Sequence, residues 1–348
     1  MSAPTGRPPA KRPTIKAVAA AAGVSTAAVS QAFNDKGRLS EATRQRILRT
    51  ALDLGWSPNA PAAALRSART RTLALVVRRP TDVLGADPHF SELITGIESE
   101  LAPRGYGLLL HLVAGVPEET ALYRRFAAEG RVDGAILTDA RDEDPRPALV
   151  TRLGLPAVVL GPPGEAGPVP GVGLGGQGAG VEEVVEHLTG LGHRRIAYVA
   201  GPAELHHTRL RRAAFEASLK AAGLRPCAVL HTDFTEVAAT AATEALLAAR
   251  ERPTAIVYAN DSMAVCGTGT AQRAGLRVPA DLSVVGYDNL PLGRWLHPRL
   301  TTVDQQVQRV GAAAARALLA RVGEDVADAA LEGRPRLVVR ESTGPAPD

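Results

Sequence analysis

From residue 73 onward, short apolar runs alternate with stretches whose apolar residues recur at helical spacing. The runs are LALVV (73–77), GLLLHLV (107–113), GAILT (134–138), PAVVLG (156–161), RIAYVAG (195–201), AIVYA (255–259) and LSVVGYD (282–288). The helical stretches cover 90–102, 119–129, 179–190, 208–222, 236–249 and 262–274. Strands that alternate with helices in this way predict an α/β fold with parallel sheets. Because about 275 residues are too many for one such sheet, we expect two similar lobes.

Residues 14–54 have a different pattern, which predicts three short helices and therefore an all-α head. A hydroxyl residue stands where each helix needs an N-cap, at Thr14, Ser25 and Ser40. Gly23 ends the first helix, so the first two helices form a helix-turn-helix candidate. The third helix is expected to bury one apolar stripe, formed by Ile47, Leu48, Ala51 and Leu52.

The charge distribution sets the head apart from the lobes. The chain has 40 Lys and Arg against 36 Asp and Glu, a formal net charge of +4. Residues 1–72 hold 12 basic and three acidic residues, a net charge of +9, which leaves −5 for the remainder. A basic head on a mildly acidic body indicates a nucleic-acid contact at one end.

The exposed start of the second helix has the residue types that read DNA. Short polar side chains suit phosphate contacts, and a glutamine can bond adenine through two hydrogen bonds. The alternative is a three-helix bundle that only packs. The residues concerned are Ser25, Thr26, Ala27, Ser30, Gln31 and Asn34.

The segment 57–72 reads as a basic linker with a short helix over 59–66. Asn59 can cap this helix, and Pro61 is tolerated only in its first turn. Leu65 is an apolar residue among polar and basic ones. It either packs against the protein or inserts between base steps from the minor groove.

The motifs occur in an order that resembles the lactose-repressor (LacI) family of bacterial transcriptional regulators. The matching segments are TIKAVAAAAGVSTAAVSQAFND, LSEATRQRIL, LGWSPNAPAAALRSARTRTLALVV, GRVDGAIL, HLTGLGHRRIAYVAGP, YANDSMA, LRVPADLSVVGYDN and PRLTTVDQ. The resemblance implies a homodimer on a pseudo-palindromic operator, with each second helix in a major groove and each Leu65 in the central minor groove. It also implies a two-lobed, periplasmic-binding-protein-like domain for a small, sugar-like effector.

The resemblance assigns roles in the head residue by residue. The positions that match backbone contacts are Thr14, Ser25, Ser30, Asn34, Arg38, Ser40 and Asn59, and those that match base contacts are Thr26, Ala27 and Gln31. Gln31 stands where Arg is frequent, and Ala63 stands where Arg or Gln is common. With Pro61 also unusual, a relative's operator sequence cannot be transferred to this chain.

In the lobes, the resemblance assigns effector contacts to Arg211, Phe234, Asn260 and Asp288. Their chemistry suits a polyol, because Arg donates hydrogen bonds, Asp accepts them and Asn does both. The phenylalanine ring can stack on the face of a sugar. Independently of the resemblance, we expect Phe90, which follows Pro88 and His89, to act as a lid residue from the first lobe. Several expected acceptors are absent, because glycines stand where Asp or Asn is frequent, at Gly161, Gly173, Gly175 and Gly176. Val307 replaces an aromatic residue. Two further interpretations therefore stay open: the effector is not a simple neutral sugar, or the chain has lost its response to a ligand.

Other classes of function find weaker support. The run Gly171–Gly176 fits GxGxxG, but prolines interrupt its strand and the expected acid after the next strand is missing. The chain has no catalytic elbow, zinc-protease or phosphate-loop motif. We read His206 and His207 as a solvated loop rather than a metal pair. We therefore expect neither an enzyme nor a cofactor or metal.

The expected organisation follows from these patterns. It has a basic tail (1–13), a helix-turn-helix domain (14–58), a hinge helix and linker (59–72), a first effector lobe (73–171 with 305–331) and a second lobe (172–304 with 332–344). Two unpaired cysteines and the lack of an apolar leader at the start favour the cytoplasm. The alternatives are a small-molecule binding protein without DNA regulation, as in periplasmic sugar capture, and a nucleotide-dependent enzyme.

Overall fold

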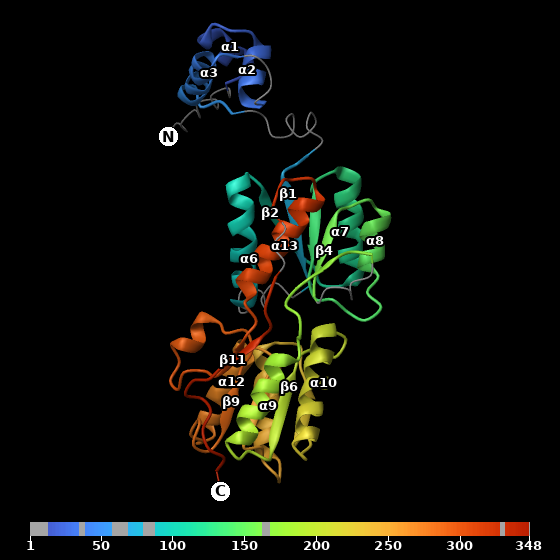
Figure 1. Cartoon of the computed structure of the whole chain (residues 1–348), viewed down its shortest axis with the longest axis vertical. Coiled ribbons are helices and arrows are strands. Elements are labelled where there is room, and N and C mark those ends of the chain that lie inside the picture. The colour runs from blue at the N-terminus through green and yellow to red at the C-terminus, as the bar shows by residue number, and fades with distance from the viewer. Residues whose placement is uncertain are drawn as a thin grey trace, which may run out of the picture. The chain divides into compact units, whose positions relative to one another are not determined.

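A computed structural model of the chain describes residues 13–34, 39–57, 69–78, 88–161, 168–327 and 331–347. The chain divides into two compact units, Met1–Thr70 and Arg71–Asp348 (Figure 1). The predicted hinge helix at 59–66 lies outside the described residues. So do the predicted DNA-contacting residues Arg38, Asn59 and Leu65.

The first unit contains three helices, α1 (Ile15–Ala22), α2 (Thr26–Asn34) and α3 (Glu41–Asp53). The three predicted N-caps are confirmed: the hydroxyl oxygens accept hydrogen bonds from backbone amides three residues later, at 3.4 Å for Thr14, 3.1 Å for Ser25 and 3.3 Å for Ser40. Gly23 adopts the left-handed conformation (φ 65°) that the tight turn between α1 and α2 requires.

The expected stripe on α3 is wrong at one position. Ile47 and Ala51 are buried, but Leu52 is 79% exposed. At about 100° per residue, a side chain five positions after Ile47 points well away from it. The core of this unit is completed by residues of α1 and α2, with the Phe33 ring edge-on to Trp56 at 5.2 Å.

The second unit begins with a five-stranded parallel sheet in the order β2-β1-β3-β4-β5. Its strands are β1 (Thr72–Val77), β2 (Gly107–Leu112), β3 (Gly134–Leu137), β4 (Ala157–Leu160) and β5 (Gly171–Val172). The helices around it are α6 (Pro88–Leu101), α7 (Val116–Glu129), α8 (Arg146–Arg152) and α13 (Val307–Arg321), with a short turn η1 (Ala102–Arg104). Alternate residues of β1 enter the cores on the two faces of this sheet.

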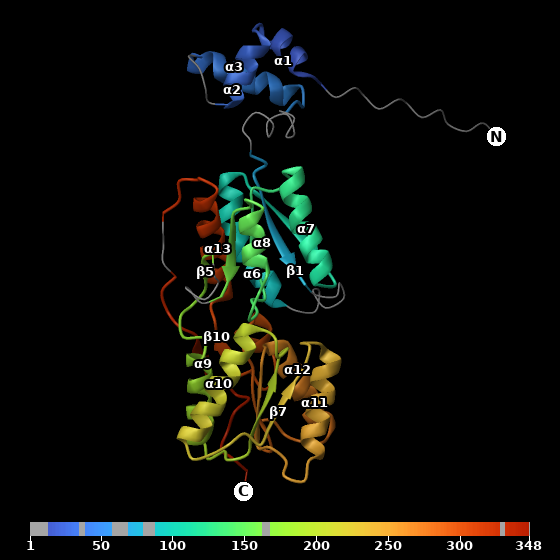
Figure 2. The same ribbon diagram turned by 90° about the vertical axis from the view of Figure 1, so that its right-hand side faces the viewer.

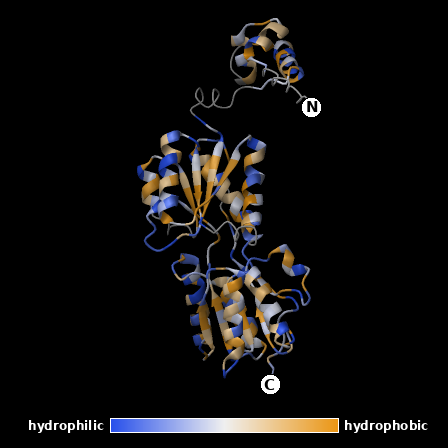
Figure 3. Cartoon of the chain, turned by 180° about the vertical axis from the view of Figure 1, so that it is seen from behind, coloured by the Kyte–Doolittle hydropathy of each residue, from blue (hydrophilic) through white to orange (hydrophobic). Residues whose placement is uncertain are grey.

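The second lobe has a four-stranded parallel sheet in the order β7-β6-β8-β9. Its strands are β6 (Ile196–Ala200), β7 (Ala228–His231), β8 (Ala255–Tyr258) and β9 (Ser283–Val285). Its helices are α9 (Ala179–Gly190), α10 (His206–Ala221), α11 (Glu236–Ala248) and α12 (Asp261–Arg273), followed by the turn η2 (Pro291–Arg294). Figure 2 shows helices on both faces of each sheet, and the strands are largely apolar in the hydropathy colours of Figure 3. Buried residues of helices and strands form two cores in each lobe. The predicted α/β architecture with two parallel sheets is confirmed.

The chain crosses between the lobes more than once. After β5 it enters α9 of the second lobe, and after β10 (Thr302–Asp304) it returns as α13 to the first. The last strand, β11 (Arg336–Val338), then pairs antiparallel with β10. In the first lobe α13 packs tightly on α6: a Cβ at Gly311 would lie 2.4 Å from the Leu93 carbonyl oxygen, so only glycine allows this approach.

Across the described residues, no helix combines the length and the apolar character that a bilayer crossing requires.

Candidate functional site

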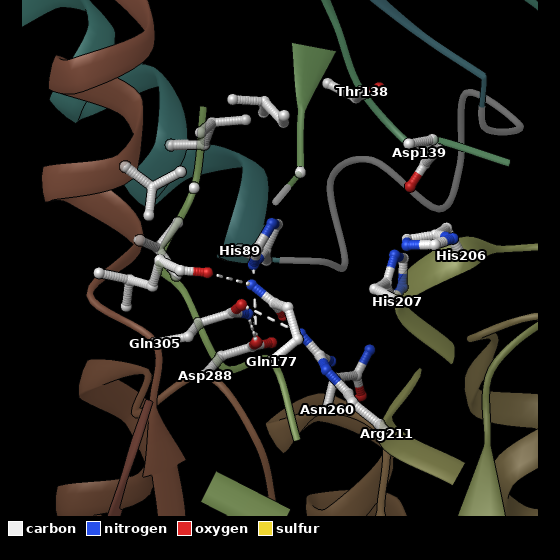
Figure 4. A pocket seen from close by; sticks show the side chains of 18 of the residues that line it. His89, Thr138, Asp139, Gln177, His206, His207, Arg211, Asn260, Asp288 and Gln305 are labelled. Carbon is white, nitrogen blue, oxygen red and sulfur yellow. Dashed lines mark hydrogen bonds and ion pairs between the residues drawn. The ribbon is translucent and has the colours of Figure 1, made fainter. Parts of the chain in front are cut away.

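A cavity lies between the two lobes, at the carboxyl ends of both parallel sheets (Figure 4). It is partly open to solvent, and its empty space, with the solvent at its opening included, amounts to about 1030 Å³. Its walls come from segments that follow the strands of both sheets and from the first turns of α6, α10 and α13. In open α/β sheets this edge is where ligands bind, and a concave site lined by apolar, aromatic and a few polar side chains is typical of small-molecule binding.

The four residues that the resemblance assigned to the effector and the separately predicted lid residue all line this one cavity. They are Phe90, Arg211, Phe234, Asn260 and Asp288. They come from α6, α10, the segment after β7, the end of β8 and the end of β9, so the fold gathers residues that are up to 198 positions apart in the chain.

Asp288 occupies a strained position at the end of β9. Its φ is 119°, a region that non-glycine residues rarely adopt, and its side chain is buried. The Gln305 amide nitrogen donates to the Asp288 carboxylate, and the Gln305 oxygen accepts from Arg211 at 3.1 Å (Figure 4). Gln305 therefore connects the Asp288 carboxylate with the Arg211 guanidinium.

Arg211 is held in place by more than Gln305. Its guanidinium lies over the Tyr287 ring, 3.6 Å from the ring centre, and it donates to the Ala259 carbonyl at 3.4 Å. A guanidinium that stacks on a ring while donating from its edge has a defined orientation. Burial raises the pKa of Tyr287, which keeps that ring neutral beneath the charge.

Asn260 is both a helix cap and part of the cavity wall. Its side-chain oxygen accepts from the Met263 amide at 2.8 Å, which caps α12. The neighbouring Asp261 is buried and accepts from the Leu290 amide at 2.7 Å and from Thr302. Burial raises the pKa of the Asp261 carboxyl well above its usual range. Asp261 thus ties together two points of the chain that lie next to the cavity residues, one shortly after Asp288 and one shortly before Gln305.

Phe234 presents a ring whose position depends on a glycine. Its φ is 69°, and a Cβ at Gly201 would lie 2.2 Å from the ring. The ring is nearly parallel to that of His207, with an interplanar angle of 19° and a centroid distance of 6.3 Å. The cavity therefore has an aromatic wall on the side of the second lobe.

Phe90 does not have the form of a lid. It is buried in the first-lobe core and forms a fixed part of the cavity wall. The adjacent His89 extends from the same helix toward the second lobe, with its Nδ1 atom 3.7 Å from the Asp288 carboxylate. The resemblance assigns no role to His89.

The solvated-loop interpretation of His206 and His207 is wrong. Both residues begin α10, line the cavity, and have partly buried side chains. The part of the chain that the structure describes contains no group of three or more His, Cys, Asp or Glu side chains placed to hold a metal ion. Thr138, Asp139, Gln177 and Gln305 were missed as well, although two of them directly follow β3, where a strand-end signal was available.

The structure explains why glycine is required at one of the cavity positions. A Cβ at Gly173 would lie 2.8 Å from the Gly161 carbonyl oxygen, so a larger residue cannot occupy this backbone. The acceptors expected there are absent, but polar groups are contributed by Asp139 and His206 on another wall. The cavity therefore retains a polar lining.

In the first unit, α2 presents the predicted base-reading face. Thr26, Ala27 and Gln31 are exposed, and Ser30 is half-buried. Asn34 is the last residue of α2. Short polar side chains on an exposed second helix are the arrangement that a helix-turn-helix offers to the major groove.

Comparison with known proteins gives two family matches. Residues 14–59 match the bacterial regulatory proteins of the lacI family, and residues 185–343 match the periplasmic binding protein-like domain. The chain is 33% identical to the HTH-type transcriptional repressor PurR of Vibrio vulnificus (strain CMCP6), over 94% of this chain and 98% of that protein. It is also 33% identical to the HTH-type transcriptional regulator CelR of Thermobifida fusca, over 95% and 98%.

Solved structures agree with these matches. A lac repressor dimer bound to operator and the anti-inducer ONPF is similar with a TM-score of 0.82 and 27% identity, over 96% of this chain and 100% of that one. A complex of the transcriptional regulator CelR with cellobiose is similar with a TM-score of 0.69 and 32% identity, over 95% and 100%.

Proposed function

Since the chain belongs to the lacI family of bacterial regulatory proteins, we propose that it represses transcription by binding an operator and is gated by a small molecule. One observation carries this proposal. The same chain joins a helix-turn-helix unit to a two-lobed unit whose cavity gathers Arg211, Asn260 and Asp288. Its relatives of known role are transcriptional regulators.

The DNA-binding part of the proposal assigns different tasks to charged and neutral residues. The net charge of +9 in residues 1–72 provides affinity for phosphate, whereas Thr26, Ala27 and Gln31 read bases from α2. Leu65 inserts into the minor groove at the centre of the operator. Because the operator is chromosomal DNA, we place the protein in the cytoplasm.

We further propose that the protein binds its operator as a homodimer. The similar lac repressor structure is a dimer on operator DNA. In this chain Trp295, one of only two tryptophans, is 84% exposed beside the exposed Leu292 in the turn η2. Large apolar side chains exposed together are typical of protein interfaces, so we assign this face to contact with a second copy.

The effector we propose is a sugar or a sugar derivative. Asp288 accepts from hydroxyls, Arg211 donates to ring or hydroxyl oxygens, and Phe234 covers a sugar face. Cellobiose, which is bound in the similar CelR complex, is the first probe to use. Effector binding would change the fraction of molecules able to hold the operator.

Selection of bound fragments from random DNA tests this proposal. The expected result is an enriched site with two inverted half-sites, which the full-length protein binds far more tightly than random DNA. Repeating the binding assay with cellobiose and other sugars then identifies the effector. Enrichment of no common site would reject the operator proposal, and an enriched site insensitive to every sugar tested would reject the sugar class.

A further inference from the structure

The first lobe contacts the second beside the cavity through the segment 140–142. The His206 amide, at the start of α10, donates to the Ala140 carbonyl at 2.9 Å, and Arg141 pairs with Leu205 as an isolated antiparallel bridge. Ala140 and His206 also line the cavity, so this contact borders the space where a ligand enters.

A shared carboxylate reinforces this contact. Asp142 Oδ1 accepts from Arg209 Nη2 at 2.7 Å and lies 3.1 Å from His206 Nδ1. The hydrogen bond from His206 and the charge of Arg209 lower the pKa of the Asp142 carboxyl, which therefore stays ionised near neutral pH. We call the contacts of Asp142 with His206 and Arg209 the clasp.

A buried ionic cluster around Arg146 holds the first-lobe segment that leads to Asp142. Arg146 is only 3% exposed and donates to the Asp139 carbonyl at 2.9 Å, to Glu119 at 2.8 Å and to Asp144 at 2.6 Å. Burial by itself would lower the pKa of Arg146, but Asp144 and Glu119 outweigh burial and raise it. A permanently charged Arg146 thus fixes the backbone three residues before Asp142.

We propose that the clasp holds the lobes together beside the cavity, so that Asp142 influences the affinity for the effector without touching it. Asp142 is a positioning residue in this proposal, because it acts through His206, which lines the cavity. The proposal rests on the effector function proposed above and adds a determinant that lies outside the ligand contacts.

The clasp can influence effector affinity because closure of the two lobes costs conformational entropy. Separated lobes have conformational freedom that is lost when they close, and each contact made only in the closed form offsets part of that loss. Asp142 and Arg209 are 50% and 56% exposed, so their pair is screened by salt and easily broken. A clasp of this strength favours closure while still permitting opening.

Hydrogen exchange of the full-length protein, without DNA or ligand, tests the clasp directly. Asp142→Asn should speed exchange of the His206 amide by about 3- to 10-fold, as expected for the loss of an exposed charge contact made to two donors. The matched control is Glu216→Gln, which removes a similarly exposed ion pair with Arg212 within α10 and should leave the exchange of the His206 amide unchanged.

A charge exchange separates the clasp from general destabilisation. Asp142→Arg alone should speed exchange at His206, and adding Arg209→Asp should restore protection to within about twofold of the unaltered protein. Equal exchange in Asp142→Asn and Glu216→Gln, or no rescue by the double variant, would overturn the proposal.

Calorimetry with cellobiose as the probe extends the test to affinity. If cellobiose binds, Asp142→Asn should weaken it by about 3- to 10-fold, and unchanged affinity in that variant would overturn the affinity part of the proposal. Because the exchange experiment needs neither operator nor effector, a failure of the proposed repressor function would leave its result intact and interpretable.

Discussion

The side-chain amide of Gln305 donates to the carboxylate of Asp288 at the floor of the cavity, from the segment that leads out of the second lobe. Gln305 lies between β10 and α13, so it belongs to a crossing between the lobes, whereas Asp288 lies in the segment that follows β9 of the second lobe. A ligand that forms a hydrogen bond with Asp288 therefore contacts the residue to which Gln305, at a crossing between the lobes, also bonds. This relationship connects ligand binding with lobe geometry.

Asp288→Ala should abolish the response to the effector while leaving operator binding intact. The substitution removes a buried acceptor for two hydroxyls, and charged hydrogen bonds of this kind together account for about 100-fold in affinity. Operator binding with and without effector measures both effects. Gln272→Ala, on the exposed face of α12, is the control. Loss of operator binding as well would indicate misfolding, and a full response would remove Asp288 from the site.

Gly201→Ala should weaken the effector by about 10-fold or more through Phe234. The new methyl group would lie 2.2 Å from the present position of the ring, so the ring must move out of the aromatic wall. Calorimetric titration with the identified effector measures the change. Gly190→Ala, where a Cβ would meet no other atom within 4 Å, provides a matched control. Equal affinities in the two variants would contradict the proposed role of Phe234.

Leu65→Ala should reduce discrimination between operator and random DNA by about 10-fold. A wedge contributes only where the base step can be opened, so its loss weakens the specific complex more than the nonspecific one. Competition binding measures the ratio of the two affinities, with Val237→Ala, an exposed apolar residue on α11, as the control. An equal loss on both DNAs would argue against insertion.

Operator affinity should fall steeply with salt, because Lys and Arg side chains release counterions when they bind phosphate. For about six to ten phosphate contacts, affinity should decrease by about 10³- to 10⁵-fold between about 50 and 200 mM salt. Lys16→Gln, at an exposed position of α1, should reduce the slope by about one contact. A flat dependence would be incompatible with the proposed phosphate contacts.

The second lobe should lose stability as pH falls below about 6.5, the ordinary pKa of histidine. His193 is fully buried, with Nε2 3.0 Å from the Gly344 carbonyl, and burial lowers its pKa, as it does that of His187. The unfolded chain then binds more protons than the folded one, so stability is present above about 6.5 and is lost toward the lower folded pKa. Calorimetric unfolding at pH values between about 7.5 and 5 should show a falling Tm.

His193→Gln should flatten this pH dependence, whereas the exposed His297→Gln should not. A Tm that stays constant over this range in the unaltered protein would contradict the argument.

Most of the fold could be predicted because each strand or helix leaves a local pattern. The alternation in 73–288 located the long buried strands, and the hydroxyl residues located the starts of the head helices. The strand β7 was missed because three of its residues are half-buried and one is exposed, which leaves no continuous apolar run. The strands β5 and β10 were missed because they have only two and three residues.

The sequence by itself determined the two kinds of domain and the residue types of the second helix of the head. Four of the residues around the cavity were predicted through resemblance and a fifth, Phe90, without it. Only the tertiary structure decided that His89, His206 and Gln305 face the same space. These residues stand at a helix start or a lobe crossing, where no periodicity marks a function. Their proximity arises because two separate sheets place their carboxyl ends opposite each other, and that arrangement depends on contacts between segments more than 100 residues apart.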